Sequence, residues 1–234
     1  IICTGGYGAN NEMLADLAPG NSAWCALRDS VTETGDGIRM ALWAGAELEA
    51  GGACMIWNRA ILPDGFEFNE DRMGGDIFLP GSQPFLHVKV NGERFMSESV
   101  PYDYILQGAL NQPEDTYCTV WDSKYPDDVV RFSTQGCSRL VEFENGAPPQ
   151  IPLIAVMGMN EGLVEQGFVQ QADTVEELAE KLGIPSEAFA KTVERYNDLF
   201  EKQVDEDFGK EPYRLSSLSE PPFYGVRQAG YLLC

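Results

Sequence analysis

The chain of 234 residues has little histidine, few basic residues and no long apolar run. It holds one histidine, His87, and its six cysteines include no C-x-x-C pair, so we expect no zinc site of the usual Cys/His kind. Its 16 basic residues face 37 acidic ones, and the resulting net charge of -21 repels nucleic acid and anionic membranes. No apolar run approaches the roughly 20 residues that span a bilayer. We therefore expect neither nucleic-acid binding nor membrane insertion.

Glycine and cysteine patterns argue against two further features. The sequence contains no G-x-G-x-x-G, so the phosphate-binding fingerprint of dinucleotide-binding folds is missing. Several cysteines lie in apolar or glycine-rich settings, such as Cys3 in IICTGG and Cys54 in GGACMIW. These settings predict small buried residues rather than a disulfide framework. Apolar residues make up 44% of the chain, which allows a packed core.

Both ends of the sequence have the composition of interrupted strands. The chain opens on Ile1-Ile2-Cys3 and closes on Leu232-Leu233-Cys234, each inside an apolar run. We expect a fragment of a longer, soluble bacterial protein. The sequence leaves open whether that protein is cytoplasmic or extracytoplasmic.

The most informative stretch is Val88 to Tyr104, VKVNGERFMSESVPYDY. Its first valines alternate with polar residues, which predicts a half-buried strand, and Asn91-Gly92 predicts a tight turn. Arg94, Glu98 and Tyr102 follow the turn. One interpretation is that these polar groups are aimed into a cleft, and the other is a surface hairpin with an ordinary ion pair.

Two glycine-rich segments stand near the start of the chain. Residues 1–20 predict a strand, a glycine turn at Thr4-Gly5-Gly6 and a helix over 10–17. In the second segment, Thr34-Gly35-Asp36-Gly37 precedes apolar and small residues at helical spacing. Glycine lets the backbone approach a ligand closely, and a helix amino terminus offers free N–H groups to a polar cofactor. The alternative is a plain helix with Asp36 as its cap.

The rest of the chain predicts a mixture of strands and helices. Residues 53–87 lack a clear period and predict irregular structure, with His87 as a strand residue rather than a base. Residues 117–122 predict a strand, residues 105–110 a short helix, and the Pro-Phe-Tyr near 222–224 the start of a return strand. The spacing of the nearby acids does not fit a calcium loop and predicts solvated carboxylates, namely Asp115, Asp122, Asp127 and Asp128.

The strongest helical signals lie in residues 161–204. A capping box runs from Thr174 to Glu177, and Gly183-Ile184-Pro185 separates two helices. The second helix has an apolar face that predicts core and no chemistry, formed by Phe189, Val193, Tyr196, Leu199 and Phe200.

The chain resembles one known superfamily in the segment G-E-R-F-x-x-E, which Pro101-Tyr102-Asp103 follows. This segment is similar to the active-site segment of FAD-dependent fumarate reductases, succinate dehydrogenases and 3-ketosteroid dehydrogenases, usually G-x-R-F-x-N-E, with Ser97 in place of the Asn. Fumarate reductases carry a proton-donating arginine where this chain has Tyr102. A tyrosine there resembles the ketosteroid dehydrogenase branch, in which a tyrosine takes part in proton transfer. The T-G-G and T-G-D-G segments also resemble the superfamily, in the same order.

The resemblance argues against fumarate as the substrate. Fumarate reductases bind a substrate carboxylate through a His-Pro-Thr, and the corresponding residues here are Trp57-Asn58-Arg59-Ala60. Their Thr-Glu-x-x-Arg cluster should fall near Ile77–Gly81, where IFLPG has none of those groups. Both anchoring sets for a dicarboxylate are replaced.

The resemblance implies an α+β fold in three parts. A capping domain of the fumarate reductase and succinate dehydrogenase type would cover residues 53–228. A remnant of an FAD-binding α/β domain would cover residues 1–52, and residues 229–234 would start the return into it. FAD is the implied cofactor of the intact protein, while the fragment alone is expected to be colourless and inactive. The implied cofactor-binding residues are Thr4, Gly5, Gly6, Thr34, Gly35, Asp36 and Gly37.

The intact protein would move a hydride between flavin N5 and the β-carbon of an alkene conjugated to a carbonyl or carboxylate. Tyr102 would handle the proton on the neighbouring carbon, and Arg94 and Glu98 would shape the loop through an ion pair. The identities of the unsaturated small-molecule substrate and of the electron donor stay open. So do three alternatives: a dehydrogenase of steroid-like rings, which Tyr102 favours; an oxidase related to aspartate oxidase, which the lost anchors disfavour; and a binding module without a redox role.

Overall fold

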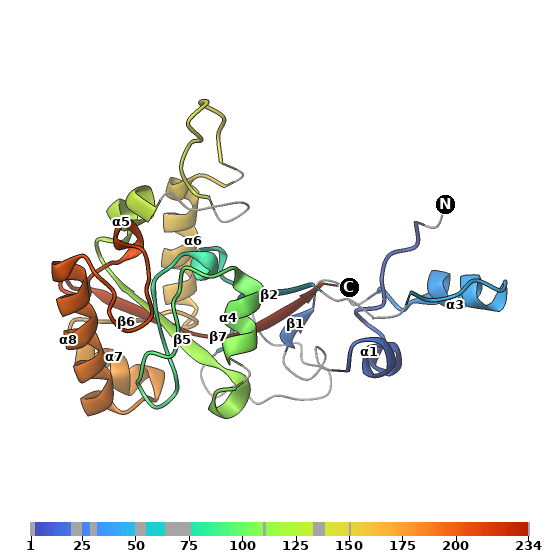
Figure 1. The fold of residues 1–234 in the computed structure, drawn as a ribbon, viewed down its shortest axis with the longest axis horizontal. Coiled ribbons are helices and arrows are strands. Elements are labelled where there is room, and N and C mark those ends of the chain that lie inside the picture. Colours follow the sequence, from blue (N-terminus) through green and yellow to red (C-terminus); the bar gives the residue numbers. More distant parts are fainter. Residues whose placement is uncertain are drawn as a thin grey trace.

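The computed structural model combines helices with one mixed β-sheet (Figure 1). It describes residues 3–19, 25–28, 32–49, 55–63, 76–109, 111–132, 139–149 and 151–233. The strands are β1 (Cys25–Arg28), β2 (Met55–Ile61), β3 (Asp76–Ile77), β4 (Leu86–Val88), β5 (Tyr117–Asp122), β6 (Gln170–Ala172) and β7 (Phe223–Leu233). The helices are α1 (Asn11–Leu17), α3 (Asp36–Trp43), α4 (Tyr102–Ala109), α5 (Tyr125–Phe132), α6 (Leu153–Glu165), α7 (Val175–Leu182) and α8 (Ser186–Lys202). Short 3₁₀ turns are η1 (Leu79–Ser82), η2 (Pro113–Asp115) and η4 (Pro212–Arg214).

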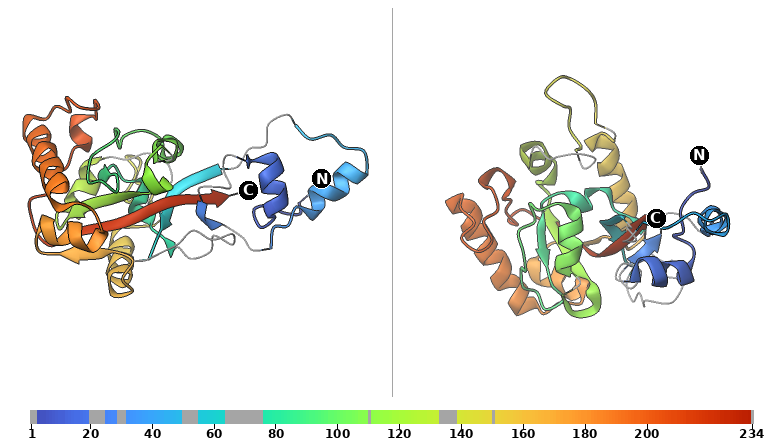
Figure 2. Two further views of the ribbon diagram at one scale, coloured as in Figure 1. Left: turned by 90° about the horizontal axis from the view of Figure 1, so that it is seen from below. Right: turned by 45° about the vertical axis from the view of Figure 1, so that its right-hand side comes forward.

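Strand β7 organises the sheet because other strands pair along both of its edges. The main order is β3-β2-β7-β5-β4, and β1 and β6 also pair with β7. Along one edge, β5 pairs with the first half of β7 and β1, which is parallel to β7, pairs with its last residues. Along the other edge, β6 pairs with the start of β7 and β2 with its second half. The predicted return strand is therefore confirmed, and it is the long arrow that crosses the molecule in Figure 2.

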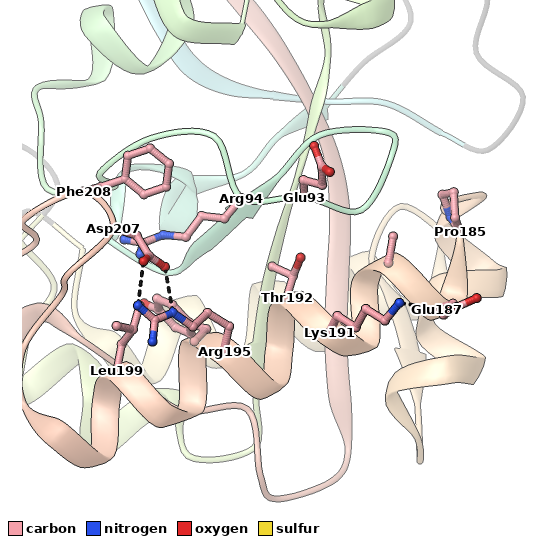
Figure 3. A pocket seen from close by; sticks show the side chains of 12 residues that line it. Glu93, Arg94, Pro185, Glu187, Lys191, Thr192, Arg195, Leu199, Asp207 and Phe208 are labelled. Carbon is pink, nitrogen blue, oxygen red and sulfur yellow. Dashed lines mark hydrogen bonds and ion pairs between the residues drawn. The ribbon is translucent and has the colours of Figure 1, made fainter.

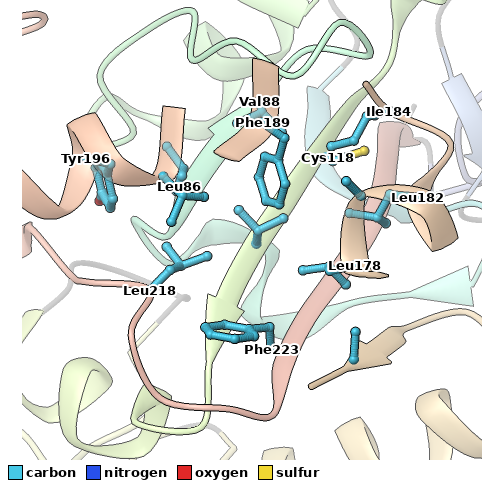
Figure 4. Close-up of a cluster of buried hydrophobic side chains, with 14 of the residues drawn as sticks. Leu86, Val88, Cys118, Leu178, Leu182, Ile184, Phe189, Tyr196, Leu218 and Phe223 are labelled. Carbon is cyan, nitrogen blue, oxygen red and sulfur yellow. The ribbon is translucent and has the colours of Figure 1, made fainter. Parts of the chain in front are cut away.

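Different helices cover the two faces of the sheet. A large apolar cluster joins α7 and α8 to β4, β5 and β7. Figure 4 shows two of its members, Leu178 of α7 and Phe189 of α8. A second cluster joins α5 and α6 to the other face. Phe223 belongs to the first cluster, whereas Tyr224 and Val226 pack with the second. Successive side chains of a strand point to opposite faces, so β7 serves both cores.

Local signals account for α7 and α8. The N–H of Glu177 donates to the Oγ1 of Thr174 at 3.1 Å, and Gly183 ends α7 with a left-handed φ of +68°. Both features confirm the predicted cap and stop. The predicted core face of α8 is also confirmed, with Phe189, Val193, Tyr196 and Leu199 buried and Phe200 partly buried.

Helices α1 and α3 lie at the end of the molecule opposite α7 and α8 (Figures 1 and 2). The predicted first helix is confirmed, and the Oδ1 of Asn10 caps it by accepting the N–H of Met13 at 3.0 Å. The second is also confirmed, but its cap is Gly35 and not Asp36. Gly35 holds a φ of +78°, which favours glycine, and Asp36 is already the first helical residue.

The prediction of irregular structure over residues 53–87 was wrong for much of the described part, because β2, β3 and η1 fall there, whereas the strand predicted at His87 is β4. In β2 four consecutive residues, from Asn58 to Ile61, are buried. A strand that is buried on both faces shows no polar alternation, so its period is hidden. Helix α6 likewise starts at Leu153, earlier than the predicted helical region.

Two of the acids predicted to be solvated are buried. Asp122 is 1% exposed, and its Oδ2 accepts the N–H groups of Ser219 at 2.9 Å and Glu220 at 3.1 Å. Asp128 is 6% exposed and pairs with Arg131; burial raises the pKa of Asp128 to about 6 although Arg131 opposes the shift. Asp122 thus holds the loop at Ser219 and Glu220 to β5, and Asp128 pairs within α5; local composition could not reveal either role.

Cys118 is buried as predicted, whereas Cys3 is exposed. Cys3 lies in a loop rather than in the predicted strand, so no sheet covers it. Predictions for Ile1, Ile2, Cys54 and Cys234 fall outside the described residues. In the part of the chain that the structure describes, no helix has the length and apolarity needed to cross a membrane.

Candidate active site

The segment that resembles an active site is a turn followed by a buried ion pair. The N–H of Lys89 donates to the carbonyl of Glu93 at 2.9 Å, and Gly92 has a φ of +84°, which confirms the Asn91-Gly92 turn. Arg94 then donates from Nε and Nη2 to the two carboxylate oxygens of Glu98, at 2.9 and 2.8 Å. The predicted ion pair is confirmed. Its side chains are only 6% and 0% exposed, so this is not an ordinary surface pair.

A loop distant in sequence completes the coordination of Arg94. Its Nη1 and Nη2 donate to the Oδ1 and Oδ2 of Asp205 at 2.9 and 2.8 Å. Asp205 also accepts the backbone N–H groups of Asp207, Phe208 and Lys210, at 3.1, 3.2 and 2.9 Å. One carboxylate therefore shapes the loop that follows α8 and binds it to Arg94.

Lys210 joins the same loop to Glu98. Its side chain is fully buried, and its Nζ lies 3.1 Å from the Oε2 of Glu98. The ammonium also donates to the hydroxyl of Tyr196 on α8 and to the carbonyl of Pro84 before β4. We call the set of two cations and two anions the buried charge cluster: Arg94, Glu98, Asp205 and Lys210.

Electrostatics within the buried charge cluster favour the charged forms. Burial raises the pKa of Glu98, but Lys210 and Arg94 lower it further, to about 2. Burial also raises the pKa of Asp205, and Arg94 together with backbone N–H groups brings it down to about 2. Burial lowers the pKa of Arg94, yet the two carboxylates hold it above its ordinary value. These three groups are therefore ionised at neutral pH.

Tyr102 is the first residue of α4, four positions after Glu98. The carbonyl of Pro101 accepts the N–H groups of Tyr104 and Ile105, at 3.0 and 3.3 Å, so the helix starts directly after the proline. The position of Tyr102 is thus set by a proline-initiated helix. Its side chain lies outside what the structure describes.

Helix α4 connects this segment to the amino-terminal part of the chain. Leu106, one helical turn after Tyr102, is 4% exposed and clusters with Tyr7 and Leu14. Ile38 of α3 packs against the same cluster. The predicted proton-transfer helix and the two glycine-rich segments therefore share one small core.

The two glycine-rich segments lie side by side. The N–H of Gly35 donates to the carbonyl of Gly6 at 3.0 Å. Gly37 packs against Thr4 so closely that an added Cβ would lie 1.7 Å from the Oγ1 of Thr4, and glycine is therefore required there. The structure brings together the residues predicted to bind the cofactor.

The segments that replace the carboxylate anchors serve the fold. Asn58 is fully buried; its Nδ2 donates to the carbonyl of Gly81 at 2.7 Å, and its Oδ1 accepts from Ser82 at 3.1 Å. Phe78 is also fully buried and stacks on Trp121 at 5.1 Å between ring centroids. These groups tie β2 to η1 and fill the core, so they are not available to grip a substrate carboxylate.

His87 is a buried strand residue, as predicted. Burial lowers the pKa of His87 to about 3, with further lowering by Lys210 and Arg94 against the opposing effect of Glu98. The imidazole is therefore neutral at physiological pH. Its backbone N–H donates to the Oε1 of Glu98 at 3.2 Å, so His87 supports the segment through its main chain.

A groove of about 700 Å³ borders Arg94 of the buried charge cluster, between α8 and the loops around Glu93 and Phe208 (Figure 3). Its charged side chains neutralise one another. Arg195 pairs with Asp207 at 2.7 Å, and Lys191 pairs with Glu187 at 2.7 Å. The charged side chains that line the groove are therefore paired, and the rest of its lining is largely apolar. Among its described residues, no charged side chain is left to bind a ligand.

Comparison with known protein families decides the assignment. The family described as "FAD binding domain" matches residues 1–229. The chain belongs to this FAD-binding domain family. The resemblance to FAD-dependent reductases and dehydrogenases is thereby confirmed, and FAD is the cofactor that the family implies.

Relatives within this family carry names that refer to different substrates. The chain is 28% identical to the vinyl phenol reductase of Lactiplantibacillus plantarum over 96% of the chain and 45% of that protein. It is also 28% identical to the 3-oxosteroid 1-dehydrogenase of Mycolicibacterium smegmatis, over 97% of the chain and 40% of that protein. The chain thus spans less than half the length of these relatives. A flavocytochrome c3 fumarate reductase in its open conformation matches the fold with a TM-score of 0.66 at 24% identity, over 98% of the chain and 34% of that structure.

The described residues fit the cofactor of the FAD-binding family. Gly35 supplies no side-chain cap to α3, so the first N–H groups of the helix remain available to other acceptors. Thr4, Gly5, Thr34 and Asp36 around this point are exposed. Polar oxygens such as those of a phosphate are favourable partners of a helix amino terminus. These residues would hold a polar part of FAD.

Asp205 and Lys210 are site residues that the sequence did not reveal. The segment from Asp205 to Asp207 has the composition of a solvated acidic loop, yet Asp205 and Lys210 are 7% and 2% exposed. Lys210 follows three consecutive acids, and its burial depends on contacts with Glu98 and Tyr196 that no local pattern encodes. The only local signal was the single base in an acidic stretch.

Proposed function

We propose that the protein carrying this chain is an FAD-dependent oxidoreductase. It transfers a hydride between flavin and an alkene conjugated to a carbonyl or carboxylate. Residues 53–228 would form the capping domain, residues 1–52 part of the FAD-binding domain, and residues 229–234 the return into it. Strand β7 runs across the boundary at 228, so one strand would serve both units.

The observation that carries the proposal is the core shared by α4 and the glycine-rich segments. Leu106 packs with Tyr7, and Ile38 of α3 packs on the same cluster. Residues three or four apart lie on the same face of a helix, so position 102 shares the face of Leu106. This geometry supports a proton-transfer residue that stands near the cofactor-binding segments.

Tyr102 would move the proton. Bound FAD would carry the hydride at N5: the reduced flavin would give it to the substrate in the reductive direction, and the oxidised flavin would take it in the oxidative direction. The adjacent carbon of the substrate would gain or lose the proton. A phenol with an ordinary pKa of about 10 donates at neutral pH, and it can act as a base if its neighbours lower that value. Pro101 restricts the backbone before the helix and would fix the direction of the phenol.

The substrate would not be a dicarboxylate. Asn58 and Phe78 are engaged in the fold at the places where fumarate reductases carry carboxylate-binding groups. The relative named NADH:acrylate oxidoreductase supports an unsaturated substrate with one carboxylate, and it stands beside a relative named NADH:fumarate oxidoreductase at similar identity. We therefore expect the full-length protein to turn over such alkenes and to reduce fumarate poorly.

This substrate preference can be measured with reduced viologen dye under anaerobic conditions. Acrylate and fumarate would be compared at equal concentration, and acrylate should give the higher kcat/KM. Efficient fumarate turnover would contradict the proposal. The second candidate, dehydrogenation of a 3-oxosteroid, is favoured by Tyr102 and the relative from Mycolicibacterium smegmatis. It predicts turnover with a 3-oxosteroid and an artificial electron acceptor instead.

Changing Tyr102→Phe tests the proton-transfer role. The ring is kept and only the hydroxyl is lost, so folding should survive. Turnover of the alkene by the full-length protein should fall by about 10²–10⁴-fold, the usual contribution of general acid–base catalysis. Flavin reduction by an artificial donor should hardly change, because it needs no substrate proton. Retention of full alkene turnover would return Tyr102 to a structural role.

A further inference from the structure

The turn that leads to Tyr102 is tied to residues 205–214 through the buried charge cluster. Within that cluster, Lys210 connects three parts of the molecule. Its ammonium contacts the carboxylate of Glu98, the hydroxyl of Tyr196 on α8 and the carbonyl of Pro84 before β4. An ammonium has three N–H donors, and each contact accounts for one of them.

The next residue of the turn is held by the same part of the chain. The carbonyl of Ser99 accepts a hydrogen bond from the Nη1 of Arg214 at 3.1 Å. Only Val100 and Pro101 separate this contact from Tyr102, and Val100 packs against the apolar cluster that contains Ile105 of α4. Between Glu98 and the start of α4, the side chain of Glu98 is thus held by Lys210 and the carbonyl of Ser99 by Arg214.

Fold stability alone is a poor explanation for this arrangement. Removing four ionic groups from water is costly, and apolar residues of similar volume often stabilise a core as well or better. Buried ionic groups can instead impose one geometry, because their hydrogen bonds tolerate little displacement. The structure shows a saturated carboxylate at Glu98, which receives donors from Arg94, His87 and Lys210.

We infer that Lys210 is a positioning residue for proton transfer by Tyr102. It fixes Glu98 against α8 and β4, and Glu98 in turn sets the backbone that presents Tyr102 to the substrate. This inference rests on the proposed role of Tyr102. A displacement of about 1 Å at a reacting group can lower a rate by about 10²-fold, so a loosened turn should act on turnover rather than on substrate binding.

A double-mutant cycle in the full-length, FAD-loaded protein tests this inference. Lys210→Met removes the ammonium and keeps much of the side-chain length. In the Tyr102 background it should lower kcat for the best alkene substrate by about 10- to 100-fold with little change in KM. In the Tyr102→Phe background it should cause no further loss, because the group that it positions is already gone. Flavin content and the flavin spectrum should match those of the wild type.

Lys191→Met is the matched control. Lys191 lies on α8 and pairs with Glu187 at 2.7 Å, but its side chain is 70% exposed, and kcat should stay at the wild-type value. Asp205→Asn gives a second cycle that keeps the shape of the buried side chain, and it decides the question if Lys210→Met fails to fold.

Three results would overturn the inference. The first is an unchanged kcat in Lys210→Met, or in Asp205→Asn where that variant is used. The second is an equal fold-loss in both Tyr102 backgrounds, which would mean a general structural effect. The third is full turnover by Tyr102→Phe alone; this removes the proposed role of Tyr102 while the alkene reduction itself stands, and it is recognised because the single variant already shows it.

Discussion

At the scale of single residues, Glu98 should make the fold sensitive to acid. Its pKa is about 2 in the folded protein, against about 4.3 for an exposed Glu. Because the folded-state pKa is the lower one, this stabilisation is present above about pH 4.3 and is lost as the pH falls toward 2. Glu98→Gln should flatten this dependence. It should also lower the free energy of unfolding at pH 7 by about 3–5 kcal/mol, since it leaves buried cations unpaired.

Guanidinium unfolding at pH 7, 4 and 3 gives the free energy of unfolding of the wild type and of Glu98→Gln. The effect of Glu98 is the difference between these two free energies at each pH. The difference is needed because Asp128, with a pKa of about 6, acts in the opposite direction. Its contribution is present below about pH 3.9 and is lost as the pH rises through 6. Glu187→Gln, which removes an exposed partner of Lys191, should keep the wild-type pH dependence. Equal acid dependence in all three proteins would show that Glu98 is not the sensitive group.

At the scale of elements, predictability followed the range of the interactions. Helices α7 and α8 were predicted because a capping box, a glycine stop and an apolar face are local features. Strands β2 and β3 were not, because they owe their form to pairing with each other and with β7. Helix α4 was predicted to start near Ile105 but begins at Tyr102, where Pro101 sets the start.

The candidate site follows the same division. Arg94 and Glu98 lie in one short segment, and their ion pair was predicted from the sequence. The partners that bury the pair come from the loop after α8, 111 residues away for Asp205. That the helix of Tyr102 lies near the glycine-rich segments was likewise implied only by the family resemblance. In the structure it results from the packing of Leu106.

At the scale of the whole molecule, α3 stands out because large apolar side chains on it are exposed. Its apolar side chains are open to solvent, with Met40 54% and Trp43 81% exposed. The exposed Thr4, Gly5 and Thr34 lie beside it. In the described part of the chain, the two predicted cofactor-binding segments are folded, but one side of them is exposed to solvent.

The 234-residue chain alone should therefore not retain FAD. It contains no G-x-G-x-x-G to bind the pyrophosphate, and the exposed segments around Gly35 offer only part of a binding surface. Purified alone and mixed with excess FAD, the chain should pass a desalting column colourless, whereas the full-length protein should stay yellow at about one flavin per chain. Absorbance at the flavin band measures this directly. A yellow, stoichiometric complex of the short chain would show that Thr4–Gly6 and Thr34–Gly37 suffice for binding, and it would place the main affinity for the cofactor in these two segments.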